Sequence, residues 1–184
     1  MRWLTCLPIF FGLAAVSGMP QPNQTGLARS ATTGPALAKR FAGAWRLVSV
    51  DGNPPGLAGF YDRPTGMIVY LASGRMAVQI AAKAGRKPFA PFNQGRLSAT
   101  PEEKAAAFDS YLAYYGTYTV DGQAGTVTHH IEDYSVPGRR GTANIRWFEF
   151  RGDDRLVLIP VEDGKGGVIA RKDATYKLFW ERIK

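Results

Sequence analysis

The chain has 184 residues, of which 45% are hydrophobic and 12% aromatic, so it is long and apolar enough for one domain with its own core. Its formal net charge of +8 comes from basic residues scattered in short pairs, and this spacing does not favour nucleic-acid binding. The single cysteine, Cys6, lies near the N-terminus, which excludes thiol catalysis, disulfides and cysteine-ligated metals from the rest of the chain.

Residues 1–18 have the pattern of an export signal. A charged start, Met1-Arg2, precedes an apolar run over residues 3–16, and the small residues Ser17-Gly18 follow. A membrane-spanning helix needs about 20 apolar residues, so an uncleaved anchor is the less favoured alternative. We predict a signal peptide over residues 1–18, a periplasmic or secreted protein, and no stable membrane span after processing.

Residues 19–40 are rich in Pro, Gln, Thr, Ser, Gly and Ala and contain few large apolar side chains. Such a composition is typical of a segment that does not pack against a core. We therefore predict a flexible linker over residues 19–40 and a single folded domain over residues 41–184.

The folded part alternates short β-branched and aromatic segments with turn signals. The predicted strands are residues 43–50, 66–71, 75–82, 115–120, 126–133, 142–150, 156–161 and 175–183. Strands joined in sequence by hairpins favour an antiparallel meander. Eight antiparallel strands hide their edges by closing on themselves, and a barrel of this size holds one small ligand. The prediction is an all-β, eight-stranded antiparallel barrel.

One short helix is predicted between the third and fourth strands. Thr100 is placed as its N-cap, Pro101 occupies the first helical position, and Glu103 completes a capping box. The helix is expected to run to about residue 114. Four apolar residues at helical spacing are expected to face the barrel: Phe108, Tyr111, Leu112 and Tyr115.

Several short segments spread over the folded part form a recognisable set. They are residues 43–49, which begin Gly43-Ala44-Trp45, and residues 74–76, 102–104, 113–118, 127–130, 141–142, 146–148 and 180–182. Taken together, they resemble the bacterial and fungal lipocalin-like domain family over about residues 41–183. The resemblance implies a β-barrel with a central pocket for a small, largely apolar molecule. It implies no particular activity, because a few related members resemble small cyclase or isomerase enzymes.

The same resemblance assigns structural roles to two residues. In a lipocalin-like barrel the tryptophan of the first strand packs under one end, often against a basic residue of the last strand. Trp45 and Arg182 stand at these positions. A cation–π contact between them contributes about 0.5–2 kcal/mol.

Strand alternation selects the candidate ligand-binding residues. It places Tyr70, Tyr118, His129 and Arg146 together inside the barrel. An inward arginine is costly unless it is paired, so it suits the binding of a carboxylate or enol oxygen, and His129 is placed to act as an acid or base. The alternative is that Arg146 closes the barrel by hydrogen bonds to carbonyls and tyrosines, and that the tyrosines are core residues.

Neither a metal nor a cofactor is predicted. His129 and His130 are neighbours on a strand, so their rings point to opposite faces and do not share one ion. His130 and Glu132 share a face, but two ligands are too few for a closed site.

Three functions remain open at this point. The leading hypothesis is an exported protein that binds a small hydrophobic molecule, with any carboxylate or carbonyl on it met by Arg146. The second is a cofactor-free cyclase or isomerase, with His129 as general acid–base and Arg146 or Tyr118 stabilising an oxyanion. The third is an interaction module whose barrel is packed solid.

Overall fold

The structure is a computed structural model that describes residues 34–52, 63–82, 86–89, 97–162 and 168–184. The predicted signal peptide and residues 19–33 of the predicted linker lie outside these residues. The end of the linker prediction was wrong, because residues 34–41 form helix α1 (Gly34–Phe41). Leu37 and Phe41, one helical turn apart, are both buried against the barrel, and this burial fixes the segment.

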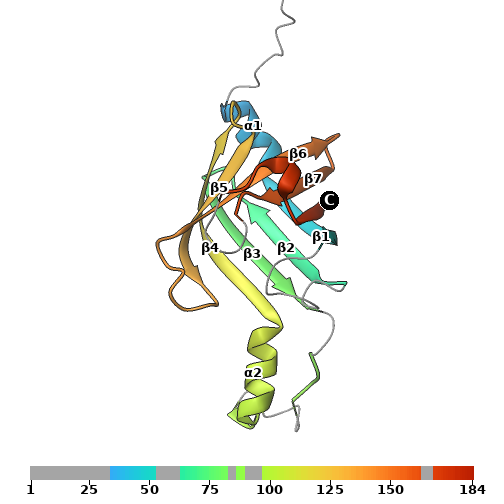
Figure 1. The fold of residues 1–184 in the computed structure, drawn as a ribbon, viewed down its shortest axis with the longest axis vertical. Coiled ribbons are helices and arrows are strands. Elements are labelled where there is room, and N and C mark those ends of the chain that lie inside the picture. Colours follow the sequence, from blue (N-terminus) through green and yellow to red (C-terminus); the bar gives the residue numbers. More distant parts are fainter. Residues whose placement is uncertain (1–33, 53–62, 83–85, 90–96, 163–167) are drawn as a thin grey trace, which may run out of the picture. The chain divides into compact units, whose positions relative to one another are not determined.

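The described residues form eight strands that pair in chain order into one closed antiparallel barrel, in which the last strand returns to the first (Figure 1). The strands are β1 (Gly43–Gly52), β2 (Thr65–Tyr70), β3 (Arg75–Ala81), β4 (Tyr111–Asp121), β5 (Thr126–Tyr134), β6 (Ala143–Arg151), β7 (Arg155–Pro160) and β8 (Tyr176–Arg182). One turn of 3₁₀ helix, η2 (Arg171–Asp173), precedes β8. The predicted fold class is confirmed.

The predicted helix begins where expected but is shorter. Helix α2 (Pro101–Asp109) has Thr100 as its N-cap and the complete capping box with Glu103. It ends at Asp109, because the chain from Tyr111 onward pairs with β3 and continues as β4. No residue of α2 is buried, and Phe108 is 49% exposed, so the prediction that this helix packs onto the barrel was wrong. No helix in the described residues is long and apolar enough to cross a membrane.

Helix α1 closes one end of the barrel. The ring of Phe41 is fully buried and lies 5.0–5.1 Å from the rings of Tyr70, Phe148 and Phe150, measured between centroids. These three ring pairs pack edge to face, which is a favoured arrangement for aromatic pairs. A cluster of aromatic rings therefore surrounds the last residue of α1.

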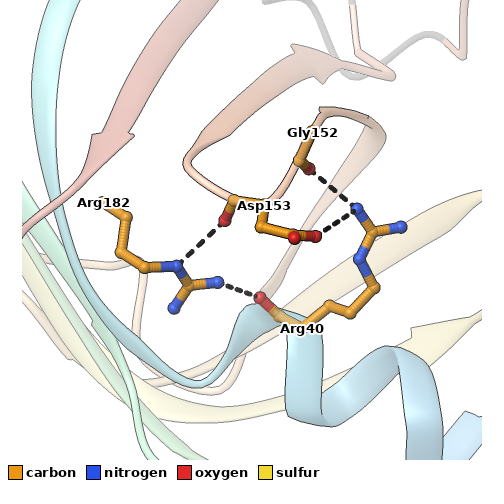
Figure 2. Close-up of polar contacts among 4 residues, drawn as sticks. All are labelled: Arg40, Gly152, Asp153 and Arg182. Atoms are coloured by element: carbon orange, nitrogen blue, oxygen red, sulfur yellow. Dashed lines mark hydrogen bonds and ion pairs between the residues drawn. The ribbon is translucent and has the colours of Figure 1, made fainter.

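Arg182 holds this closed end together. Its guanidinium donates hydrogen bonds to the carbonyl oxygens of Arg40, Ala42 and Asp153, at 2.7–3.0 Å, and two of these are drawn in Figure 2. The same group lies 4.1 Å from the ring centroid of Trp45, so the predicted pair of Trp45 and Arg182 is in contact. The end of α1 is thus tied to β8 and to the turn between β6 and β7.

A second contact reinforces this attachment. Arg40, in the last turn of α1, donates to the carbonyl of Gly152 at 2.9 Å and lies 3.8 Å from the Asp153 carboxylate (Figure 2). The carboxylate is almost fully exposed, so the ion pair itself contributes little. The hydrogen bond to the backbone is the part that fixes the helix.

A bulge in β5 changes which side chains face inward. Tyr115 lies opposite Asp133 and Gly116 lies opposite Ile131, so Glu132 is an extra residue without a partner on β4. The strand accommodates it because Gly116 has no side chain: a Cβ there would collide with the carbonyl oxygen of His130. Beyond the bulge, Tyr134 takes the inward position that strict alternation would give to Asp133.

Candidate functional site

A cavity of about 280 Å³ occupies the half of the barrel away from α1. Its apolar wall consists of strand residues that include Ile68, Val78, Ile80, Leu158 and Leu178. Its polar wall includes Tyr114, His129, Asn144, Arg146 and Trp180, and its less buried part includes Tyr134, Arg139, Glu162 and Tyr176. A space of this size argues against the hypothesis of a barrel packed solid.

The structure places the four predicted ligand-binding residues at different depths. His129 and Arg146 line the cavity. Tyr70 is fully buried behind His129, to which it is hydrogen bonded, and it is not part of the cavity wall. Tyr118 lies farther toward α1, where it packs on Tyr70 and its hydroxyl donates to the carbonyl of Leu71 at 3.1 Å.

His129 is held between two tyrosines. The Tyr70 hydroxyl lies 2.7 Å from Nε2 and the Tyr114 hydroxyl lies 2.9 Å from Nδ1, so both ring nitrogens have partners. The side chain is 1% exposed. Burial, with a smaller contribution from the positive charge of Arg146, lowers the pKa of His129 from 6.5 to about 3. The imidazole is therefore neutral at neutral pH.

Tyr114 connects this histidine to the rest of the polar wall. Its side chain is buried, and burial raises the pKa of its hydroxyl to about 12. Asn144 lowers this pKa by a smaller amount, and its side-chain oxygen accepts a hydrogen bond of 2.7 Å from Arg139. Hydrogen bonds therefore join Tyr114 to His129 and Arg139 to Asn144 in the polar wall of the cavity.

Arg146 is the charged group of the cavity. It is half-buried, and its guanidinium donates to the carbonyl of its neighbour Ile145 at 2.8 Å. Within the described part of the chain it forms no ion pair. Its positive charge acts on the tyrosines around it by lowering the pKa of Tyr114, Tyr134 and Tyr176, against the larger opposite effect of burial. The arginine thus retains donors that no carboxylate of the described residues occupies.

Sequence reasoning did not select most of the polar residues of this wall, and Tyr114, Tyr134 and Trp180 show why. Tyr114 was assigned to the helix, although it is in phase with Tyr118 when the strand is extended backward. Tyr134 enters the cavity only because of the bulge at Glu132, which strict alternation does not predict. Trp180 lies two positions after Leu178, so both share the inward face of β8, and alternation could have identified it.

A closed, eight-stranded antiparallel barrel with an internal cavity is the architecture of a lipocalin-like protein. Residues 42–183 match the model of the lipocalin-like domain, and the chain belongs to this family. It is also 39% identical over 75 residues to the 4′-hydroxy-3′-methoxypropiophenone carrier protein ppsC of Aspergillus oryzae, a match that covers 36% of this chain and 68% of that protein. Among solved structures, a redesigned beta barrel matches with a TM-score of 0.42 and 9% identity over 80% of this chain and 95% of that chain.

Proposed function

We propose that this protein binds and carries a compact, largely apolar small molecule in the cavity of its barrel. The observation that carries the proposal is the cavity itself, apolar on one wall and polar on the other, at the end of the barrel that α1 does not close. Its volume of about 280 Å³ lies near the lower limit of about 300–1,000 Å³ for small-molecule sites. A ring-bearing molecule suits this volume better than a long acyl chain.

The relative from Aspergillus oryzae supports the same class of cargo. Its name gives 4′-hydroxy-3′-methoxypropiophenone as the molecule that it carries, which is a compact aromatic ketone. An aromatic ring suits the apolar wall of the cavity here, and a carbonyl or carboxylate oxygen suits Arg146. The proposal is thus a carrier of an apolar molecule that bears an oxygen group near Arg146.

The alternative of a cyclase or isomerase requires His129 to exchange protons near neutral pH. A group with a pKa of about 3 is a weak base at pH 7, far from the value at which general acid–base catalysis is efficient. Both of its ring nitrogens are also occupied by tyrosine hydroxyls. These two observations favour the carrier over the enzyme.

The Arg146→Met variant tests the role of the charge. We expect it to weaken the binding of an aromatic acid or ketone by about tenfold or more, because a hydrogen bond to a charged group contributes about 1.5–3 kcal/mol. Native mass spectrometry of the protein purified without delipidation is expected to show a bound small molecule. Isothermal titration with 4′-hydroxy-3′-methoxypropiophenone and the matching aromatic acid then measures the affinity.

Arg75→Met is the matched control. Arg75 is an exposed arginine paired with Glu132 outside the barrel, so its removal is expected to leave ligand binding unchanged. A native mass spectrum that shows only the protein without a bound molecule, together with no binding of either ligand to the wild-type protein, would contradict the carrier proposal. Equal losses in the two variants would show that Arg146 does not contact the ligand.

Export is part of the proposal and has its own test. The N-terminal pattern of residues 1–18 supports a periplasmic or secreted carrier. The full chain, expressed in a Gram-negative host, is expected to appear in the periplasmic or secreted fraction, with a mass lower by the loss of about this segment. The same chain without residues 2–18 is expected to stay in the cytoplasm. An unprocessed protein that remains in the cytoplasm contradicts export.

A further inference from the structure

The hydrogen bonds around His129 have a definite direction. A neutral imidazole has one N–H and one acceptor nitrogen, so one of its two tyrosine partners donates to the ring and the other accepts from it. Tyr70 is fully buried, and within the described residues its hydroxyl has no partner other than His129 Nε2. If Tyr70 accepted from the ring, its own buried proton would have no acceptor. Tyr70 is therefore the donor, and Nε2 is the acceptor.

This assignment places the ring proton on Nδ1, which donates to the Tyr114 oxygen at 2.9 Å. The Tyr114 oxygen thus accepts the hydrogen bond from the ring, and its own O–H has no acceptor among the described residues.

Two further side chains that line the cavity, Trp180 and Arg146, also carry hydrogen-bond donors. The indole N–H of Trp180 is buried and has no hydrogen-bond partner in the described structure, although the side chain is only 2% exposed. Indole nitrogen and guanidinium groups donate and never accept. Trp180, Arg146 and Tyr114 all line the cavity, and each has a donor to offer.

We propose that the cavity selects a ligand with an acceptor oxygen of the carbonyl class, and that Tyr114 donates its hydroxyl proton to that oxygen. Trp180 lines the same cavity with a buried indole N–H that has no partner among the described residues. A hydrocarbon of the same shape leaves these buried donors unpaired, and this is the condition under which a site rejects an analogue most strongly. The inference rests on the proposed function, because it names the chemical class of the molecule carried.

The test compares two ligands that differ in one group, propiophenone and propylbenzene. We expect the wild-type protein to bind the ketone at least tenfold more tightly than the hydrocarbon. Tyr114→Phe is expected to weaken binding of the ketone by about tenfold and to leave binding of the hydrocarbon unchanged. Tyr115→Phe is the matched control, because Tyr115 is an exposed tyrosine of the same strand that lies outside the cavity wall, and it is expected to change neither affinity.

Infrared spectroscopy of propiophenone labelled with ¹³C at the carbonyl measures the hydrogen bond to the ligand directly, independently of its affinity. A carbonyl that accepts a hydrogen bond absorbs at lower frequency, so the band of the wild-type complex is expected below that of the ketone in an apolar solvent. In Tyr114→Phe the band is expected to return toward the apolar-solvent value.

The outcomes separate this inference from the proposed function. Equal affinity for ketone and hydrocarbon, or an unshifted carbonyl band in the wild-type complex, would overturn the donor assignment and leave the carrier proposal standing. An equal loss of affinity for both ligands in Tyr114→Phe would show that Tyr114 only maintains the shape of the cavity. Failure of both ligands to bind the wild-type protein contradicts the carrier proposal, and the inference with it.

Discussion

Replacement of Arg182 by methionine is expected to lower the free energy of unfolding by about 3 kcal/mol. The guanidinium holds three backbone carbonyls, those of Arg40, Ala42 and Asp153, and it stacks on the ring of Trp45. A hydrogen bond to a charged group contributes about 1.5–3 kcal/mol and a cation–π contact about 0.5–2 kcal/mol. Because the site is only partly buried and water replaces part of these contacts in the variant, the expected net loss lies below the sum of the separate contributions. Urea unfolding followed by tryptophan fluorescence measures the loss.

Arg46→Met is the control for this variant. Arg46 lies on β1 and pairs with Glu181 on β8, so it joins the same two strands, but both side chains are substantially exposed. Such a pair contributes at most about 1 kcal/mol. Arg182→Lys is expected to fall between the two, since lysine keeps the charge but lacks the planar fork that reaches several carbonyls. Equal losses of unfolding free energy in Arg182→Met and Arg46→Met would mean that the contacts of Arg182 with α1 contribute no more to stability than an exposed ion pair.

Acidification from pH 7 to pH 5 is expected to lower the free energy of unfolding by about 2 kcal/mol through His129 alone. In the folded protein the pKa of His129 is about 3, against 6.5 in the unfolded chain. Below pH 6.5 the unfolded chain therefore binds a proton that the folded protein does not. The contribution of His129 is fully present above pH 6.5 and is lost progressively as the pH falls toward 3.

His129→Gln isolates this effect. Glutamine keeps one donor and one acceptor but does not titrate, so the difference in stability between pH 7 and pH 5 is expected to shrink by about 2 kcal/mol relative to the wild-type protein. Most carboxylates of an unfolded chain, with pKa values near 4, remain ionised over this interval and contribute little to the difference. Urea unfolding at the two pH values measures it. An unchanged pH dependence in His129→Gln would mean that His129 is protonated in the folded barrel.

The strands and the hairpins between them were predictable because they follow from short-range signals. Turn residues such as those between β2 and β3, and alternating apolar side chains within each strand, set the hairpins and their inward faces. The capping box at Thr100 likewise predicted the start of α2 correctly. These features depend on residues that are close together in the sequence.

The errors arose where distant contacts override local preference. Residues 111–114 fit a helical continuation of α2, but pairing with β3 makes them a strand. Leu37 and Phe41 lie in a segment with the composition of a linker, and their burial against the barrel makes that segment a helix. In both cases the deciding contact is with a part of the chain that local sequence patterns do not show.

The candidate site was predictable only in outline. Strand alternation placed all four predicted residues inside the barrel. In the structure His129 and Arg146 line the cavity, whereas Tyr70 and Tyr118 lie outside its wall. The direction of the hydrogen bond between His129 and Tyr114 depends on the burial of Tyr70 and on its contact with the same histidine. No strand pattern contains that information.

The hydrogen bonds between Arg182 and the end of α1 also bear on the order in which the barrel assembles. The carbonyl of Arg40 and the guanidinium that binds it are separated by 142 positions along the chain. Chains dominated by such long-range contacts fold slowly, because the entropy of closing a large loop must be overcome before the contact forms. The contacts that fix α1 therefore form only when β8 joins the barrel. Until then the partly folded barrel keeps two open strand edges, and these edges are its main risk of aggregation.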